Sequence, residues 1–481
     1  MTQPWRAGYL PGLAEHEVGW HTLPFGEGAQ RVEVAVPVLQ PSQLAALARR
    51  VKQAPALKEL PVSRIVEILD AAIARLLDPL DPFRREAERL LPAVTGYDAE
   101  MVRLGLDGFL PTFRAPQLHR FVAEDFANPK VLDEFQPAMK GGLVRAFGPD
   151  LLVHSWAGNV PALPLWSLAC GLLVKAGSIG KLPSAEPVFA SLFARLLAEV
   201  EPTLADSLAI VWWRGGDAQS AAAVFDQADT VLAYGGNEAI AQVRAQVPVT
   251  TRFLGFGHKL AFGVISAAAL DTQRGPACAR LAAHDVVRYE QQGCYSPHQF
   301  YVQRGGRVTP RDFAGYLAAE LANLQARFPR RALAFEEAAA VSGWRQSAEL
   351  RALSDPGTAL IGDVVCIDGA QPLAPTAGGR SVVVSAFDQF EDIVTLVAPH
   401  ARFLQTAGVA APPRELLRLA GLLGAAGVTR ICALGAMTSP EAGWHHDGRF
   451  NLLDLVRMVE VEASAERAAD RLARYAQEDR P

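Results

Sequence analysis

The chain has 481 residues, of which 46 are Lys or Arg and 51 are Asp or Glu, so the formal net charge is −5. Hydrophobic residues make up 50% of it and charged residues 20%, which excludes an intrinsically disordered or collagen-like chain. This length predicts two or three domains, and the slightly acidic balance argues against general nucleic-acid binding, which needs a basic face.

The first ~140 residues are predicted to be mostly helical. Apolar residues recur at helical spacing between Ile65 and Leu76, and Pro79 and Pro82 are expected to end that helix.

From Gly142 onward, short β-branched or apolar runs alternate with Ala-rich helical runs, which predicts an α/β fold with a largely parallel sheet. The predicted strands are Leu151–Val153, Leu208–Val211, Thr230–Ala233, Leu260–Ile265, Phe300–Val302, Val364–Ile367 and Val382–Val384, and the predicted helices include Pro187–Val200 and Asn237–Val247. A charged, Ala-rich tail from Glu460 to Arg480 predicts a solvated terminal helix.

The most apolar stretch, Pro164 to Val174, is shorter than the ~18 apolar residues that a membrane span needs, and Lys175 follows it. We therefore predict a buried helix there, with an amphipathic contact to lipid as the alternative. The N-terminus has no apolar core of signal-peptide length, so we expect a protein without an integral membrane segment.

Five cysteines, Cys170, Cys278, Cys294, Cys366 and Cys432, are scattered along the chain without a CxxC pair. Their odd number and irregular spacing argue against a structural zinc site. Scattered thiols in a large chain are typical of a reducing compartment, so we predict a cytoplasmic protein. Only Cys294, which follows Gly293, has mainly polar near neighbours, and it is therefore the candidate nucleophile.

In the segment His154 to Pro164, a strand ends, a turn of small residues follows, and a helix is predicted after Asn159. Ligands sit at the carboxyl ends of strands in α/β sheets, where an Asn side chain can donate an N–H to a developing oxyanion. The alternative, which these residues alone favour, is that Asn159 caps the next helix.

Two further segments have the composition of cofactor sites. Lys181, at the end of a short strand, can hold ribose hydroxyls or a phosphate, although a solvated Lys is the commoner case. Gly235 and Gly236 precede a predicted helix at Asn237, whose N-terminus can accept a pyrophosphate. The full G-x-G-x-x-G spacing is absent, so a plain tight turn is an equal alternative.

His445, His446 and Asp447 adjoin one another before a helix predicted at Leu452. Adjacent residues seldom bind one metal together, and no further ligand stands at metal-binding spacing. We therefore predict a turn here and no metal site.

Taken in chain order, these segments resemble the aldehyde dehydrogenase superfamily and, within it, the LuxC-type fatty acyl-CoA reductase branch. HSWAGNVP resembles the AGNVP segment of the branch, KAGSIGKLPSAEP the stretch that holds the cofactor ribose, and AYGGNEAI the loop before the pyrophosphate-facing helix. GFGHKLAFGVI resembles the E-L-G-G-K segment, QQGCYSPHQF the loop of the nucleophile, and GWHHDGRFNLLDLVRMVEVE the closing segment. The resemblance extends from about Gly142 to Glu462.

The resemblance implies an aldehyde dehydrogenase-like α/β fold in three parts. A helical N-terminal region and a Rossmann-type dinucleotide-binding domain would occupy residues 1–258, and an α/β catalytic domain residues 259–430. Residues 431–481 would close the site and contribute to oligomerisation, and a homo-oligomer is expected by analogy.

The resemblance also implies roles for particular residues. Cys294 would accept the acyl group, and the Asn159 side chain with the Cys294 backbone N–H would form the oxyanion hole. His258 or His298 is the candidate for the general acid or base, and the alternative is that each is structural or lies at the surface. The expected cofactor-binding residues are Trp156, Lys181, Ser184, Gly235 and Gly236.

The expected function is NADPH-dependent reduction of an acyl thioester, a long-chain fatty acyl-CoA or acyl carrier protein thioester, to the aldehyde. NADH is not excluded, because an acidic residue such as Glu186 near the ribose favours an unphosphorylated ribose. Gly255 stands where the superfamily has the Glu that activates water, so net hydrolysis of the thioester is not expected. The alternatives are CoA-acylating aldehyde oxidation and a non-catalytic binding protein on the same fold.

Overall fold

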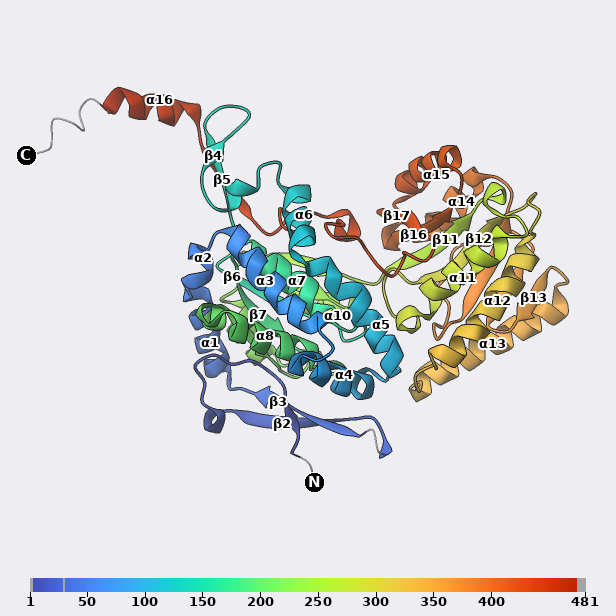
Figure 1. Ribbon diagram of the computed structural model, residues 1–481, viewed down its shortest axis with the longest axis horizontal. Coiled ribbons are helices and arrows are strands. Elements are labelled where there is room, and N and C mark those ends of the chain that lie inside the picture. Colours follow the sequence, from blue (N-terminus) through green and yellow to red (C-terminus); the bar gives the residue numbers. More distant parts are fainter. Residues whose placement is uncertain (1–2, 29–30, 474–481) are drawn as a thin grey trace, which may run out of the picture.

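A computed structural model describes residues 3–28 and 31–473 of the chain. Two lobes, each built around its own sheet, lie side by side (Figure 1). In the described residues, no helix is both long enough and apolar enough to cross a membrane.

The first lobe contains a five-stranded parallel sheet in the order β10-β9-β6-β7-β8. Its strands are β6 (Leu151–Ser155), β7 (Gly177–Lys181), β8 (Leu208–Val211), β9 (Thr230–Tyr234) and β10 (Arg252–Phe256), and the helices that follow them are α7 (Pro164–Leu173), α8 (Phe189–Val200), α9 (Ala218–Phe225) and α10 (Asn237–Gln246). The strand order reverses between β6 and β9, which pair directly. Ligands bind in the crevice outside the carboxyl ends of the strands at such a reversal.

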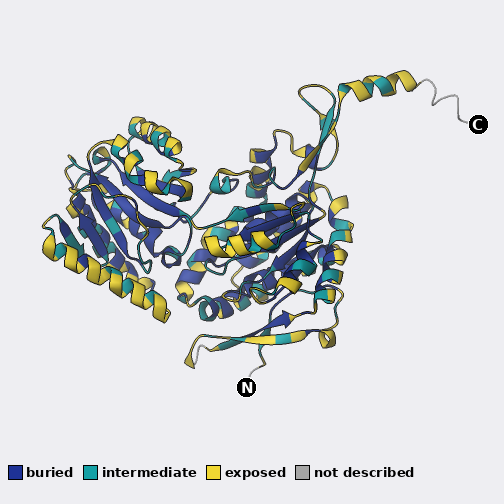
Figure 2. Cartoon of the chain, turned by 180° about the vertical axis from the view of Figure 1, so that it is seen from behind, coloured by how far each residue is buried: buried dark blue, intermediate teal, exposed yellow. Residues whose placement is uncertain are grey.

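The second lobe contains a seven-stranded sheet in the order β13-β14-β15-β12-β11-β16-β17, in which only β13 runs antiparallel to its neighbour. Its strands are β11 (Leu260–Ile265), β12 (Pro297–Gln303), β13 (Thr358–Ile361), β14 (Val364–Ile367), β15 (Val382–Phe387), β16 (Leu404–Ala410) and β17 (Arg430–Ala433). Its helices are α11 (Arg274–Val287), α12 (Pro310–Arg327), α13 (Phe335–Ser354), α14 (Phe390–Val397) and α15 (Pro413–Ala426). The strands are largely buried and the outer helices expose one face (Figure 2), which confirms the predicted α/β architecture.

The N-terminal region begins with strands, so the prediction of a mostly helical region is wrong for its first 40 residues or so. A three-stranded sheet forms from β1 (Trp5–Arg6), β2 (Gly19–Phe25) and β3 (Val32–Val38). The run VEVAVPV in β3 alternates β-branched residues in the way that favours a strand. The helices that follow are α1 (Pro41–Gln53), α2 (Ala56–Glu59), α3 (Val62–Leu77), α4 (Pro82–Thr95), α5 (Ala99–Phe109) and α6 (Ala115–Asp125).

The predicted helix between Ile65 and Leu76 is confirmed as part of α3, which buries both of these residues. The helix ends before Pro79, as expected. Pro82 has a different role: it occupies the first turn of α4, where its missing N–H costs no hydrogen bond. The Asp81 carboxylate caps this helix by accepting the Phe83 N–H at 2.8 Å.

The strands β4 (Gln136–Pro137), β5 (Leu143–Phe147) and β18 (Arg457–Val461) form an antiparallel sheet that projects from the first lobe together with α16 (Ala463–Leu472) (Figure 1). We call residues 136–147 and 457–472 the arm. Helix α16 confirms the predicted terminal helix over residues 463–472, whereas Glu460 and Val461 belong to β18 and residues 474–480 of that prediction lie outside the described residues. The helix predicted at Leu452 is wrong, because residues 451–455 form turns.

The segment Pro164 to Val174 confirms the predicted buried helix, because every residue of α7 is buried. The expected domain boundary at residue 258 falls between β10 and β11, and the one at residue 430 falls inside β17. Beyond β17 the chain returns from the second lobe to the arm of the first, where β18 pairs with β5.

Candidate active site

The loop that carries Cys294 begins with three consecutive residues in the left-handed conformation, Tyr289, Glu290 and Gln291, with φ values of 55°, 53° and 60°. L-residues disfavour this region, so packing and hydrogen bonds must hold the turn. The Glu290 carboxylate accepts from the Arg380 guanidinium at 2.5 and 3.1 Å, and both side chains are almost completely buried. Arg380 also donates to the carbonyl of Phe328 at 2.6 Å.

Cys294 opens onto a pocket of about 450 Å³ where the two lobes meet. Asn159, Gly235, Gly236 and His258 line the same pocket, so the structure brings together four residues predicted from separate segments, with Cys294 as the centre. Asn159 follows β6, and the two glycines follow β9. The carboxyl ends of these strands are adjacent because the strand order reverses between them.

The Asn159 amide does not cap a helix. Helix α7 starts five residues later, at Pro164, and no side chain caps it. The Asn159 Nδ2 donates to the carbonyl of Gln292 at 2.6 Å, which attaches the Asn159 turn to the loop of Cys294. An amide carries two N–H groups, so one remains for a ligand in the pocket.

The Cys294 thiol is surrounded by groups that sequence reasoning missed. Gln405, on β16, donates from Nε2 to the Cys294 Sγ at 3.3 Å and to the Asp447 carboxylate at 2.6 Å. The other oxygen of Asp447 lies 3.6 Å from the Lys259 ammonium. Burial raises the pKa of the Cys294 thiol to about 11, while the hydrogen bond from Gln405 acts in the opposite direction.

The turn of His445 to Asp447 was predicted as a plain turn, but it places two side chains at the site. His446 lines the pocket and stacks on Phe256 with ring centroids 4.6 Å apart. Asp447 has a left-handed φ of 55°, a conformation that Asp tolerates better than most residues. The signal in the sequence was the polar pair Gln405 and Thr406 in a strand whose other residues are small or apolar.

Three imidazoles line the pocket, those of His258, His298 and His446. Burial is the largest effect on each and lowers its pKa, to about 4 for His298. All three are therefore neutral at neutral pH. The His298 Nδ1 pairs with the Thr376 hydroxyl at 2.9 Å, which occupies one of its two ring nitrogens.

The remaining predicted cofactor residues lie nearer β7 and β8. Ser184 lines a second pocket of about 440 Å³ with Arg214 and Trp212, and it accepts from the Trp212 indole N–H at 3.2 Å. The Lys181 Nζ lies 5.4 Å from the centre of the Trp213 ring. Trp156 is 4% exposed and its indole N–H donates to Ser167, so its side chain belongs to the core.

Glu186 has a different position from the one expected. Its side chain is buried, and its carboxylate accepts from the backbone N–H groups of Val188 and Phe189 at 2.8 and 2.9 Å. Burial raises the pKa of this carboxyl group to about 7. Glu186 therefore caps the start of α8 and does not line the pocket of Ser184 and Arg214.

Gly255 lies on β10, where a Cβ atom would approach Ile240 and Phe253 to 2.9 Å. A Glu in its place would have to displace one of them. Among the residues that the structure describes around the pocket of Cys294, none that lines it is an Asp or a Glu. The arrangement can acylate a thiol and hold an oxyanion, and it offers no lining carboxylate to activate water.

The other four thiols differ from Cys294 in position. Cys170 and Cys366 are buried, whereas Cys278 and Cys432 are only partly buried. Burial raises the pKa of each of the four. None of the four lines the pocket with Asn159 and the glycines.

Solved structures with a similar fold are aldehyde dehydrogenases. The gamma-glutamyl-gamma-aminobutyraldehyde dehydrogenase of Burkholderia cenocepacia J2315 is 16% identical, with a TM-score of 0.73 over 96% of this chain and 97% of that chain. An indole-3-acetaldehyde dehydrogenase in complex with NAD⁺ is 14% identical, with a TM-score of 0.71 over 96% of this chain and 97% of that chain. These similarities establish the aldehyde dehydrogenase-like fold over nearly the whole chain.

Among curated proteins, the long-chain acyl-protein thioester reductase of Photorhabdus luminescens is 27% identical over 95% of this chain and 94% of its own length. The protein of the same name from Vibrio harveyi is 26% identical over 84% of each chain. The family model described as acyl-CoA reductase (LuxC) matches residues 57–458. The chain is thus an enzyme of the LuxC family of acyl-CoA reductases, on an aldehyde dehydrogenase-like fold.

Proposed function

We propose that the protein reduces a long-chain acyl thioester to the aldehyde through an acyl-enzyme on Cys294, with NADPH as the reductant. The observation that carries the proposal is the pocket that joins Cys294, Asn159 and the two glycines without a lining carboxylate. The names of the curated relatives support a long-chain acyl thioester as the substrate class.

In the first half of the reaction, the Cys294 Sγ attacks the thioester carbonyl and forms a new C–S bond. The oxyanion is held by the Asn159 amide and the Cys294 backbone N–H, and one such donor is worth about 3–4 kcal/mol of barrier. Collapse of this adduct breaks the original C–S bond, releases the carrier thiol and leaves the acyl group on Cys294. His258 is neutral because burial lowers its pKa, and we assign it the transfer of the thiol proton.

The residues fit a nicotinamide dinucleotide. Gly236 is the N-cap of α10, no side chain caps this helix, and a Cβ at Gly236 would meet open space, so its first N–H groups can receive a pyrophosphate. Lys181, Ser184 and Arg214 would hold the adenosine end, and the backbone next to Trp156 would lie along the cofactor. When bound, the reduced nicotinamide supplies the hydride that converts the acyl group on Cys294 to the aldehyde.

The absence of a carboxylate at Gly255 favours reduction over hydrolysis, because the described lining of the pocket lacks the carboxylate base that the superfamily's Glu supplies for activating water. The same geometry supports the reverse reaction, in which an aldehyde bound to Cys294 is oxidised by NADP⁺ and the resulting acyl group is transferred from Cys294 to CoA. Supplying an aldehyde and NADP⁺ with and without CoA measures that direction.

The test is to incubate the purified protein with a chain-length series of acyl-CoAs, with and without NADPH. We expect the intact mass to rise by one acyl group without NADPH, and aldehyde to form when NADPH is added. Cys294→Ala should lose both signals, while Cys432→Ala, which removes a partly buried thiol outside the pocket, should retain them. Adduct formation on Cys294→Ala, or release of free acid as the main product, would contradict the proposal.

Asn159 has its own test within the same assay. Asn159→Ala should lower the rate of acyl-enzyme formation by about a hundred-fold or more, because one oxyanion donor is lost. The melting temperature of the variant serves as the control for folding. An unchanged acylation rate would mean that Asn159 is structural and only attaches its turn to Gln292.

A further inference from the structure

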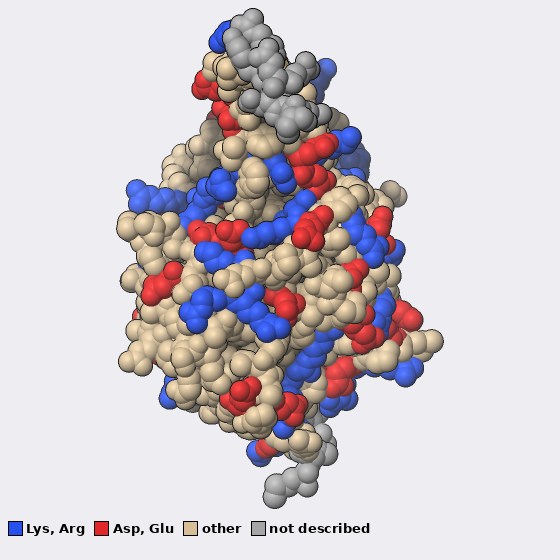
Figure 3. All heavy atoms as spheres, turned by 90° about the vertical axis from the view of Figure 1, so that its left-hand side faces the viewer, with Lys and Arg blue, Asp and Glu red and all other residues tan. Residues whose placement is uncertain are grey.

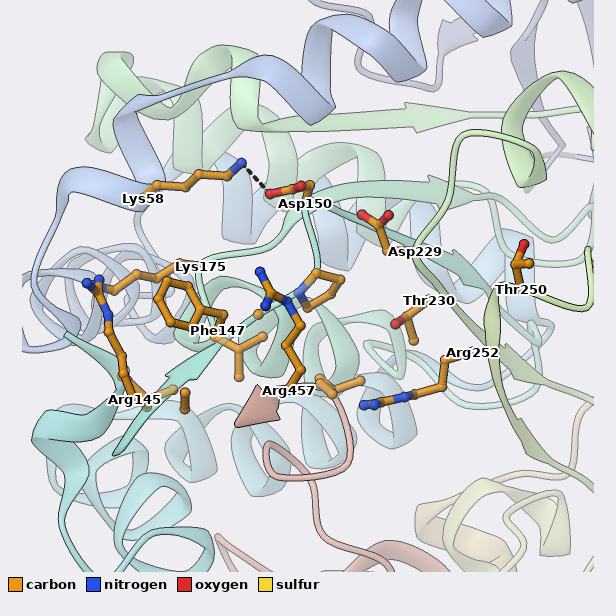
Figure 4. A pocket seen from close by; sticks show the side chains of 16 residues that line it. Lys58, Arg145, Phe147, Asp150, Lys175, Asp229, Thr230, Thr250, Arg252 and Arg457 are labelled. Atoms are coloured by element: carbon orange, nitrogen blue, oxygen red, sulfur yellow. Dashed lines mark hydrogen bonds and ion pairs between the residues drawn. The ribbon is translucent and has the colours of Figure 1, made fainter. Parts of the chain in front are cut away.

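A separate pocket of about 430 Å³ lies at the opposite edge of the five-stranded sheet (Figure 4). Its floor includes Asp150, Asp229 and Arg252, which stand where β6, β9 and β10 begin, and its wall includes Arg145 and Arg457 of the arm. In a parallel sheet the beginnings and the ends of strands lie at opposite edges. This pocket is therefore distinct from the pocket of Cys294, which lies beyond the ends of the same strands.

Basic side chains dominate the lining, which includes Lys58, Arg145, Lys175, Arg252 and Arg457. The two lysines are already neutralised. Lys58 pairs with Asp150, and Lys175 pairs with Asp133, each at 2.6 Å.

The second carboxylate of the lining, Asp229, is also occupied. It pairs with Lys52 at 2.9 Å and accepts the backbone N–H of Leu151 at 2.9 Å. No carboxylate of the lining therefore remains for the three arginines.

Those three arginines have no acidic partner among the residues that the structure describes. Arg252 donates to the backbone carbonyls of Asp454 and Val456, at 2.6 and 3.0 Å, which holds its guanidinium without cancelling its charge. The Nε of Arg145 is buried and has no hydrogen-bond partner. A buried polar atom without a partner costs free energy that a bound acceptor would recover.

Phe147 orients two of the guanidinium groups. The Cζ atoms of Arg145 and Arg457 lie 4.7 and 5.2 Å from the centre of its ring. Stacking of this kind restricts each guanidinium to one plane and leaves its N–H groups at the rim for an acceptor. Like charges held close together in a concave site concentrate a positive potential there.

We propose that this pocket binds the phosphate or pyrophosphate group of a small molecule and so bridges the arm to the edge of the sheet. Guanidinium groups match phosphate oxygens in bidentate geometry, and the pocket has the volume of a small-molecule site. The side of the molecule shown in Figure 3 mixes acidic with basic side chains, so this side presents no broad basic face of the kind that binds nucleic acid. The phosphate belongs either to free pyrophosphate or to a nucleotide.

The test measures binding of pyrophosphate and of ADP to the full chain by calorimetry, with sulfate and adenosine as controls for charge and base. The Cys294→Ala background keeps the outcome separate from catalysis. We expect Arg145→Ala with Arg457→Ala to weaken pyrophosphate binding by about tenfold or more. Arg49→Ala is the matched control, because Arg49 is exposed on α1 and does not line the pocket.

One outcome would assign the phosphate to a nucleotide: the parent binds ADP but neither pyrophosphate nor adenosine, and the double variant does not bind ADP. Binding of pyrophosphate or ADP that is equally tight in the parent and the double variant would overturn the proposal, as would a parent that binds neither of them. Arg457→Ala alone, at an exposed position, guards against a double variant that fails to fold. If the substitutions changed only the association state, in sedimentation without any phosphate effect, the arginines would contact a second copy and the proposal would be wrong.

Discussion

At the scale of the residue, the reactivity of Cys294 depends on a thiol that burial keeps protonated. With a pKa of about 11, only about one thiol in a thousand is ionised at pH 8. Gln405 favours the ionised form by donating to Sγ, and Asp447 fixes the amide of Gln405 by accepting its other N–H. The negative charge of Asp447 itself acts against ionisation of the thiol.

These opposed effects predict that two substitutions shift the pH profile of Cys294 alkylation in opposite directions. Gln405→Leu should raise the midpoint of the pH profile for alkylation of Cys294, because the donor to the thiolate is lost. Asp447→Asn should lower it, because the Asn oxygen still accepts from Gln405 while the negative charge is gone. The measurement is the iodoacetamide rate at the Cys294 peptide between pH 7 and pH 11, and equal midpoints in all three proteins would refute the role of this network.

A second prediction concerns the preference for NADPH. Arg214 is exposed beside Ser184 in the pocket that we assign to adenosine, whereas Glu186 is buried at the start of α8. Arg214→Glu should raise the KM for NADPH by about tenfold or more and leave that for NADH nearly unchanged, because only the phosphorylated ribose loses a charge partner. Glu186→Gln is the control and should leave the ratio of the two KM values unchanged; a KM for NADH that rises equally would remove Arg214 from the site.

At the scale of the element, the left-handed turn of Tyr289 to Gln291 aims the nucleophile, and the buried pair of Glu290 and Arg380 holds that turn. Arg380 comes from the loop before β15, more than 80 residues away along the chain. The position of Cys294 therefore depends on long-range packing in the second lobe as well as on its own loop.

We predict that Arg380→Leu lowers the free energy of unfolding by about 3–5 kcal/mol, because it leaves the Glu290 carboxylate buried without a partner. Acylation of Cys294 should slow at the same time. Arg304→Leu provides the contrast, since its pairs with Asp368 and Asp388 are exposed and worth about 1 kcal/mol or less. Urea denaturation measures both, and equal losses would contradict the assignment.

The same elements show how far the sequence predicts the site. The repeated pattern of strands and helices predicted the α/β class. The resemblance of the motifs, in their order, to one family predicted that Asn159, Gly235 and Cys294 share one site. The pairing of β6 with β9 brings Asn159 and Gly235 together, Cys294 comes from a loop of the second lobe, and no local pattern encodes this meeting. Gln405 and Asp447 were missed because they are 42 residues apart, and only the return of the chain after β17 makes them neighbours.

Predictions from local sequence patterns were wrong where tertiary contacts determine the position of a side chain. The motif position of Glu186 suggested a ribose contact, but the N–H groups at the start of α8 capture its carboxylate. The residues His445 to Asp447 lacked a further ligand at metal-binding spacing and suggested only a turn, although His446 lines the pocket and stacks on Phe256. Among the N-terminal strands, β3 has a strand signal in its alternating Val residues that the prediction overlooked, whereas β2 has few β-branched residues and is held by its pairing with β3.

At the scale of the whole molecule, the arm lacks a core of its own. Three antiparallel strands that project from a lobe are marginal unless another surface covers them. Two of its apolar side chains are exposed, Met139 completely and Met458 by 42%, and Phe135, the residue directly before it, is 37% exposed. Strand β18 pairs only with β5 among the described residues, which leaves its second edge open to another strand.

We therefore predict a homodimer formed through the arm. Sedimentation of the wild-type chain at micromolar concentration should give twice the 51.6 kDa mass of the monomer, and Met139→Asp with Met458→Asp should convert it to the monomer, because charges would be buried in an apolar contact. Leu353→Asp introduces the same charge at an exposed apolar residue of α13 in the second lobe and should leave the dimer intact. A monomeric wild-type chain would contradict the predicted dimer. A dimer that persists with both arm substitutions but dissociates with Leu353→Asp would place the contact on the second lobe.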